Sequence, residues 1–167
     1  MSQHFPIAPP LVVSQWFNTQ QPITLDSLRG RVVALHTFQM LCPGCVTHGL
    51  PQAVRLSNTF DAKELRVIGL HTVFEHHEVM TAAALKVFIH EYRLSFPIGI
   101  DQPDPATGLP LTMQAYGLQG TPSLVLLDKT GRVRLHQLGQ LDDLLVGAMI
   151  GRLLQEGAER TRTVLGS

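Results

Sequence analysis

The chain has 167 residues with 13 basic and 13 acidic side chains, so its formal net charge is zero at pH 7. This length suits one domain that buries its own core, and the balanced charge does not favour nucleic acid or an anionic membrane surface as a partner. We expect a single domain with its core at residues 14–157, between an N-terminal arm at 1–13 and a tail at 158–167. The sequence shows no secretory signal and no run of about 18 apolar residues, which predicts a cytoplasmic protein.

The first part of the sequence predicts short extended segments and then a buried strand. Residues 14–17 and 21–25 are expected to form a hairpin or an edge ribbon, followed by a single helical turn. The run RVVALHTFQ at 31–39 is apolar and rich in β-branched residues, which is typical of a central strand. A helix is expected at 43–60, because proline suits the first helical position. Pro51 in its interior predicts a kink.

The remaining sequence alternates strands with helices and ends in a β-hairpin and a helix. Apolar runs predict core strands, amphipathic stretches predict helices, and Lys129-Thr130-Gly131 predicts the turn of the hairpin. The expected elements are strands at 65–72, 96–100, 123–128 and 132–138, and helices at 78–93, 112–117 and 141–159. This order predicts an α/β fold of three layers, a sandwich with a mixed central sheet and an N-terminal β-hairpin extension.

The only two cysteines, Cys42 and Cys45, lie one helical turn apart where the first helix is predicted to begin. Unpaired amide groups and the helix dipole favour a thiolate at that place, so Cys42 is expected to be the nucleophile. Cys45 is expected to be more buried and to act as the resolving thiol. In a reducing cytosol such a pair is more often catalytic, redox-sensing or metal-binding than a permanent crosslink.

A second motif, Gly120-Thr121-Pro122, directly precedes another predicted core strand. An X-Pro bond can adopt the cis form there, which would turn Thr121 toward an incoming chain. Together with CPGC after a buried strand, the LLDKTGRV hairpin and the lead-in PITLDSLRGRVVALHTF, this motif resembles the thioredoxin superfamily, and more narrowly the TlpA/ResA-like redoxins. The resemblance covers residues 14–155.

The resemblance implies a thioredoxin-like fold and a protein thiol–disulfide oxidoreductase in which Cys42 and Cys45 are the redox pair. It also implies a cis Thr121–Pro122 bond that shapes the substrate groove, to which we assign Thr121, Pro122, Leu41, Pro43 and Gly44. The expected partners are a protein disulfide or dithiol and an external thiol electron donor or acceptor. No Gly-rich nucleotide fingerprint is present, so no cofactor is expected.

His36 lies six residues before Cys42, where thioredoxins place a buried acid. A histidine beneath the cysteine pair can take the proton from Cys45 during resolution, since its ordinary pKa of about 6.5 suits that role. The alternative is a core imidazole that is hydrogen-bonded to the backbone. Both interpretations stay open at this point.

Two other functions compete with disulfide exchange. A thiol peroxidase of the peroxiredoxin type would resemble P-x-x-x-T-x-x-C, but Leu35 and Gln39 stand at the proline and threonine positions. A copper or zinc site would use Cys42, Cys45 and His48 with a further histidine as the fourth ligand. The candidates for that ligand are His71, His76, His77 and His136. We expect no metal. Copper-handling relatives of the thioredoxin fold, which this arrangement resembles, have three residues between their two cysteines, whereas this chain has two.

The stretch LHTVFEHHEVMT, residues 70–81, is the other concentration of polar side chains. It follows a predicted strand at its carboxyl end, where α/β sheets place sites. Glu75, His76, His77 and Glu78 either contact substrate there or form a solvated loop before a helix, and the roles of His71, His76 and His77 stay open.

Overall fold

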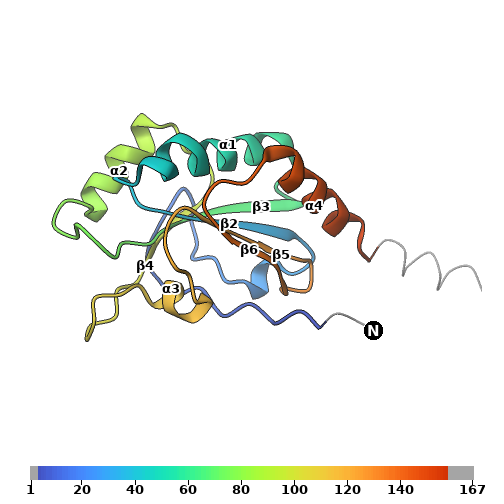
Figure 1. Cartoon of the computed structure of the whole chain (residues 1–167), viewed down its shortest axis with the longest axis horizontal. Coiled ribbons are helices and arrows are strands. Elements are labelled where there is room, and N and C mark those ends of the chain that lie inside the picture. Colours follow the sequence, from blue (N-terminus) through green and yellow to red (C-terminus); the bar gives the residue numbers. More distant parts are fainter. Residues whose placement is uncertain (1–3, 158–167) are drawn as a thin grey trace, which may run out of the picture.

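A six-stranded mixed sheet runs through the centre of the computed structural model, which describes residues 4–157 (Figure 1). The strand order is β1-β4-β3-β2-β5-β6. The strands are β1 (Val13–Phe17), β2 (Val32–Phe38), β3 (Leu65–His71), β4 (Ile98–Asp101), β5 (Ser123–Leu127) and β6 (Val133–Leu138). The pairs β2–β3 and β3–β4 are parallel, and the other three pairs are antiparallel. The predicted tail at 158–167 and the first residues of the arm lie outside the described residues.

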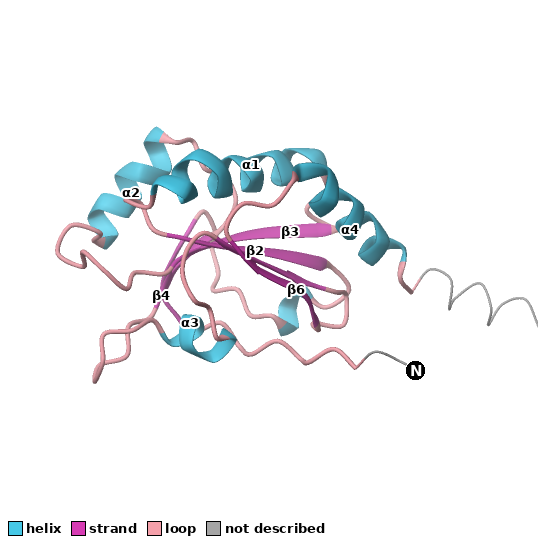
Figure 2. Cartoon of the chain, viewed as in Figure 1, coloured by secondary structure: helices cyan, strands magenta, loops and turns pink. Residues whose placement is uncertain are grey.

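Helices cover both faces of the sheet (Figures 1 and 2). One face packs against α1 (Leu50–Thr59), α2 (Ala82–Glu91) and α4 (Asp143–Gln155), and the other packs against α3 (Leu111–Tyr116) and the 3₁₀ turn Asp26–Leu28. All seven residues of β2 are buried, and its side chains alternate between the two core clusters. The predicted three-layer α/β sandwich with a mixed sheet is therefore confirmed.

The predicted N-terminal hairpin is wrong. Residues 21–25 form no strand, and β1 pairs instead with β4, far along the sequence. Asn18, directly after β1, donates from Nδ2 to the backbone carbonyls of Leu94 and Phe96. Local spacing suggested a hairpin, but Pro22 has no N–H to give to a ladder, and without β1 the edge of β4 would stay unpaired.

The first helix begins at Pro43, as expected, but it is not uniform. Residues Cys45–Gly49 form a π-helical turn in which the N–H of Leu50 reaches the carbonyl of Cys45, five residues back. Pro51 then lies in the first turn of α1 and has no N–H to give to the preceding turn. The kink expected from this proline stays a prediction, and what the structure shows is a wider turn that begins at Cys45 and ends just before α1.

The other two long helices begin where a side chain caps them. Thr81 Oγ1 accepts from Ala84 N, so α2 begins at Ala82 instead of 78. Asp142 accepts from the first amides of α4, which begins two residues later than predicted. Capping by Thr and Asp is a local interaction that periodicity alone does not locate.

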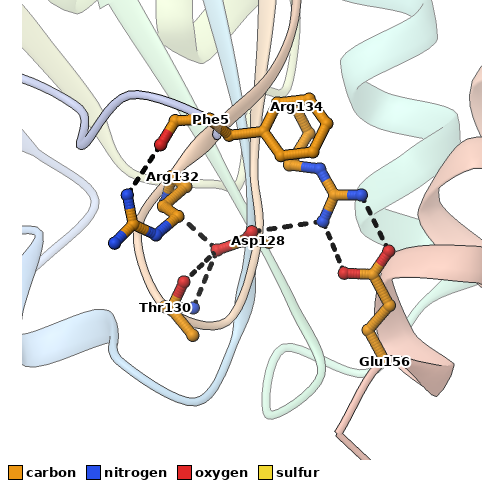
Figure 3. Close-up of polar contacts among 6 residues, drawn as sticks. All are labelled: Phe5, Asp128, Thr130, Arg132, Arg134 and Glu156. Atoms are coloured by element: carbon orange, nitrogen blue, oxygen red, sulfur yellow. Dashed lines mark hydrogen bonds and ion pairs between the residues drawn. The ribbon is translucent and has the colours of Figure 1, made fainter. Parts of the chain in front are cut away.

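A polar cluster, which we call the terminal anchor, ties the N-terminal arm and the end of α4 to the β5–β6 turn (Figure 3). Asp128 accepts from the backbone and hydroxyl of Thr130 and from Arg132 N. Arg134 bonds both Asp128 and Glu156 and lies 4.2 Å from the ring centroid of Phe5. The members are Phe5, Asp128, Thr130, Arg132, Arg134 and Glu156. The cluster lies at the end of β5 that is remote from the cysteines, since Leu127 pairs with Val33 near the start of β2.

Candidate active site

Cys42 and Cys45 lie just beyond the carboxyl end of β2, where the chain turns into the first helix. They are paired as a disulfide, with their Cα atoms 5.2 Å apart. Cys42 is half-buried, whereas Cys45 has an exposed fraction of 0% and belongs to the core that packs under the helices. Only the sulfur of Cys42 is therefore open to a partner, which is the asymmetry expected of a nucleophile and a resolving thiol.

Two backbone groups face the sulfur of Cys42. The N–H of Cys45 donates to Cys42 Sγ over 3.2 Å, and the carbonyl oxygen of Thr121 lies 3.5 Å from the same sulfur. When the disulfide is open, the amide stabilises a thiolate on Cys42 and the carbonyl can accept from a thiol. The site thus holds a group for each protonation state of Cys42.

The Thr121–Pro122 peptide bond is cis, and Pro122 packs directly on the start of the helix. A Cβ added at Gly44 would lie 3.3 Å from Pro122 Cδ, and one added at Gly49 would lie 2.9 Å from Pro122 Cβ. Glycine at these two positions lets the helix approach the loop closely. The structure therefore brings Thr121, Pro122 and Gly44 of the predicted groove to the cysteine pair.

Leu41 and Pro43, the other two predicted groove residues, are exposed on either side of Cys42. Leu41 has an exposed fraction of 59%. It lines an apolar surface pocket together with Met40, Val79, residues of α2 such as Val87, and Tyr92 directly after that helix. A large apolar side chain thus stands on the solvent side of the nucleophile.

Sequence reasoning missed a buried amide behind the cysteines. Gln39 has an exposed fraction of 1%. Its Nε2 lies 3.3 Å from Glu75 Oε1 and 3.5 Å from Thr121 Oγ1, and its Oε1 accepts from Phe74 N over 3.2 Å. A signal was available, because a glutamine that ends an apolar strand must find partners when it is buried. The same contacts commit its amide to other groups, so nothing at this position supports a peroxidase site.

His36 lies on the face of β2 that packs against α1, α2 and α4, the side on which Cys45 is buried. Its exposed fraction is 3%, its Nε2 has no hydrogen-bond partner, and burial lowers its pKa to about 4. It lines a small cleft with His48, Gln52 and Pro122, large enough for about one water molecule. No hydrogen bond joins His36 to either cysteine within residues 4–157.

The remaining histidines do not gather around the cysteines. His71 is buried, with its ring centroid 5.2 Å from that of Phe38 and its Nε2 unpartnered, and burial lowers its pKa to about 4. His76 and His77 are exposed in the loop before α2. Among the described residues, no three His, Cys, Asp or Glu side chains stand close enough together to hold a metal ion. The copper or zinc alternative therefore has no supporting geometry in residues 4–157.

A mixed sheet between helices, with a Cys-x-x-Cys pair at the start of a helix beside a cis proline, defines the class of thioredoxin-fold thiol–disulfide oxidoreductases. The chain belongs to the AhpC/TSA family, whose model matches residues 8–136. Its CxxC pair is at disulfide distance, and it is a TlpA/ResA-like redoxin, as the sequence resemblance predicted.

Two solved structures resemble the chain over most of its length. The crystal structure of a thioredoxin-like superfamily protein is 52% identical, with a TM-score of 0.88, and the match covers 90% of this chain and 97% of that one. A thiol-disulfide isomerase from Corynebacterium glutamicum is 48% identical, with a TM-score of 0.85, covering 89% of this chain and 97% of that one. These likenesses confirm the predicted thioredoxin-like fold.

Curated relatives match more distantly and are longer. The thiol-disulfide oxidoreductase ResA of Bacillus thuringiensis is 28% identical over 118 residues, which are 71% of this chain and 61% of ResA. The chain spans only 20% of the protein DipZ of Mycobacterium bovis, to which it is 28% identical over 146 residues, or 86% of the chain. None of the helices among the described residues has the length and apolar character needed to cross a membrane.

Proposed function

We propose that the protein exchanges disulfides with other proteins through Cys42 and Cys45. The observation that carries this proposal is the asymmetric pair itself, with one sulfur open to solvent, one buried, and a backbone amide aimed at the open one. The names of the relatives, which include a thiol-disulfide isomerase and a thiol-disulfide oxidoreductase, point to the same chemistry.

In the reductive direction, the Cys42 thiolate attacks one sulfur of a substrate disulfide. That bond breaks, a mixed disulfide forms on Cys42, and the other substrate sulfur leaves as a thiolate. Cys45 then attacks the sulfur of Cys42, which closes the internal disulfide and releases the second substrate thiolate. Two electrons pass to the substrate, and an external dithiol returns them by the reverse exchange. In the oxidative direction the same steps run backwards.

The substrate strand is proposed to lie along Thr121 and Pro122, because Thr121 flanks the exposed sulfur and Pro122 packs on the start of the helix. A strand that lies there gains main-chain hydrogen bonds, which favour any extended peptide over one particular sequence. The exposed apolar side of Leu41 completes the groove and contacts apolar side chains of the substrate.

We also propose a role for His36 in resolution. A pKa of about 4 disfavours a lasting imidazolium, but it leaves a neutral ring whose Nε2 is unoccupied. The adjoining cleft has room for about one water molecule, which would carry a proton outward past His48. His36 then acts as a hydrogen-bonding relay that stores no proton, which refines the simple base expected from the sequence.

A glutathione redox titration tests the function. Wild type should show one reversible two-electron transition, and Cys45→Ser should lose it while it forms a lasting mixed disulfide with glutathione through Cys42. Its midpoint gives the direction of exchange, because 30 mV corresponds to about 1.4 kcal/mol for a two-electron couple. Reaction of the reduced protein with a peptide disulfide completes the test. Absence of both the transition and the exchange would show that the proposal is wrong.

A further inference from the structure

The carboxylate of Glu75 stands beside the proposed substrate groove because a buried amide fixes it there. Gln39 Nε2 contacts both Glu75 Oε1 and Thr121 Oγ1, so these two acceptors flank one nitrogen. Gln39 Oε1 also accepts from the N–H of Phe74, the residue before Glu75. One side chain therefore joins the loop after β3 to the residue along which the substrate strand lies.

This carboxylate has no positive neighbour in the segments that surround the cysteines. Residues 32–54, 67–85 and 117–127 contain no Lys or Arg, and Glu75 and Glu78 are their only permanently charged side chains. Glu75 is exposed and forms no ion pair within residues 4–157. Its negative charge is therefore available to a side chain of a bound substrate.

We propose that Glu75 is a specificity-determining residue that favours protein disulfides carrying Lys or Arg beside the reacting cysteine, and that Gln39 positions it. The inference rests on the proposed exchange function and adds a class of substrate to it. An exposed ion pair contributes only about 0.2–1 kcal/mol, because water screens it and both side chains lose freedom. The preference is thus a matter of selection among substrates and not of catalytic power.

The experiment uses the reduced full chain and three disulfide peptides that differ only in the residue next to the cysteine, which is Lys, Gln or Glu. Single-turnover rate constants are measured at low ionic strength. Wild type should react about twofold to fivefold faster with the Lys peptide than with the Glu peptide, which lies within the range that ion pairs of this strength produce. High salt should bring the ratio close to one.

Variants separate this role from a general effect on the fold. Glu75→Gln should reduce the Lys-to-Glu ratio to near one. Glu78→Gln, the matched change three residues away, should keep it. Gln39→Leu should lower the ratio partly and should speed amide hydrogen exchange at Phe74, whose hydrogen bond it removes. Gln52→Leu removes another buried glutamine that bonds Leu141 and Asp143 instead, and it should leave exchange at Phe74 slow.

Other outcomes would overturn the proposal. A wild-type ratio near one, a ratio that Glu75→Gln leaves unchanged, or an equal fall in Glu78→Gln would each contradict the role of Glu75. An undiminished ratio in Gln39→Leu would contradict the positioning role of Gln39. If the neutral Gln peptide does not react either, the proposed exchange function is itself wrong and the preference is lost with it.

Discussion

The terminal anchor and the two buried histidines near the cysteines differ in how their polar atoms are paired. In the terminal anchor, the carboxylate of Asp128 accepts hydrogen bonds from Thr130, Arg132 and Arg134. At the cysteine end, His36 and His71 keep a buried ring nitrogen without a partner. An unpaired buried polar group costs stability, so a cluster that only holds the fold pairs every member. Arg66 Nε, near the start of β3, is likewise buried without a partner, so the contrast lies between these two sets of residues and not between whole ends of the sheet.

Asp128→Ala tests the terminal anchor and should have the largest effect on stability. It removes an acceptor of several hydrogen bonds, one of them from a guanidinium, and should lower the free energy of unfolding by about 2–3 kcal/mol at pH 7. Denaturant unfolding measures this loss. The exchange rate of the cysteines, measured well below the unfolding transition, should stay at the wild-type value.

The pH dependence of the same comparison follows from the pKa of Asp128. Burial raises it, but the hydrogen bonds from Thr130, Arg132 and Arg134 outweigh that effect and lower it below the ordinary 3.8. A carboxyl whose pKa is lower in the folded state stabilises the fold above its unfolded value, and this contribution is lost as the pH falls through the folded value. The difference in free energy of unfolding between wild type and Asp128→Ala should therefore decrease only below about pH 4. A difference that already decreases near pH 6 would contradict this account.

Gly49→Ala tests the close packing at the cysteine end. The added Cβ would meet Pro122 Cβ at 2.9 Å, so the π-helical turn or the loop must move. We expect a loss of about 1–2 kcal/mol in stability, together with a lower kcat/KM for a peptide disulfide, because Pro122 shapes the groove. Gly147→Ala in α4 is the control. Nothing lies within 4 Å of its added Cβ, and it should raise stability by about 0.5–1 kcal/mol with unchanged kcat/KM.

His71→Leu tests the unpaired histidine that does not line the cleft. Burial lowers the pKa of His71 to about 4, so between about pH 4 and 6.5 the unfolded chain takes up a proton that the folded chain excludes. Because of this residue, the free energy of unfolding of wild type should fall by about 1–2 kcal/mol between pH 7 and pH 5, and His71→Leu should not show this fall. Unfolding curves at the two pH values measure it. If the free energy of unfolding depends on pH equally in the two proteins, this interpretation is wrong.

Sequence patterns predicted the strands of the sheet well, because a buried strand such as β2 must be apolar along its whole length. It was the family resemblance, and not the residue pattern, that placed the cysteines and Thr121-Pro122 in one site. The pairing of β1 with β4 was missed, because it joins residues more than eighty positions apart. The contact of Gln39 with Glu75 was missed for a related reason. Each residue has an ordinary local role, and only the folded sheet brings them together.

The same long-range pairing has a consequence for the order of folding. β1 finds its partner only when residues 98–101 are available, and Ala8 bonds the carbonyl of Gly131 still later in the chain. During synthesis, β1 therefore leaves the ribosome well before its partner strand and is ordered late. Until then the apolar residues of β1 stay open to other chains. A ribosome-bound chain that ends before residue 98 should thus be more prone to aggregation than one that ends after 138.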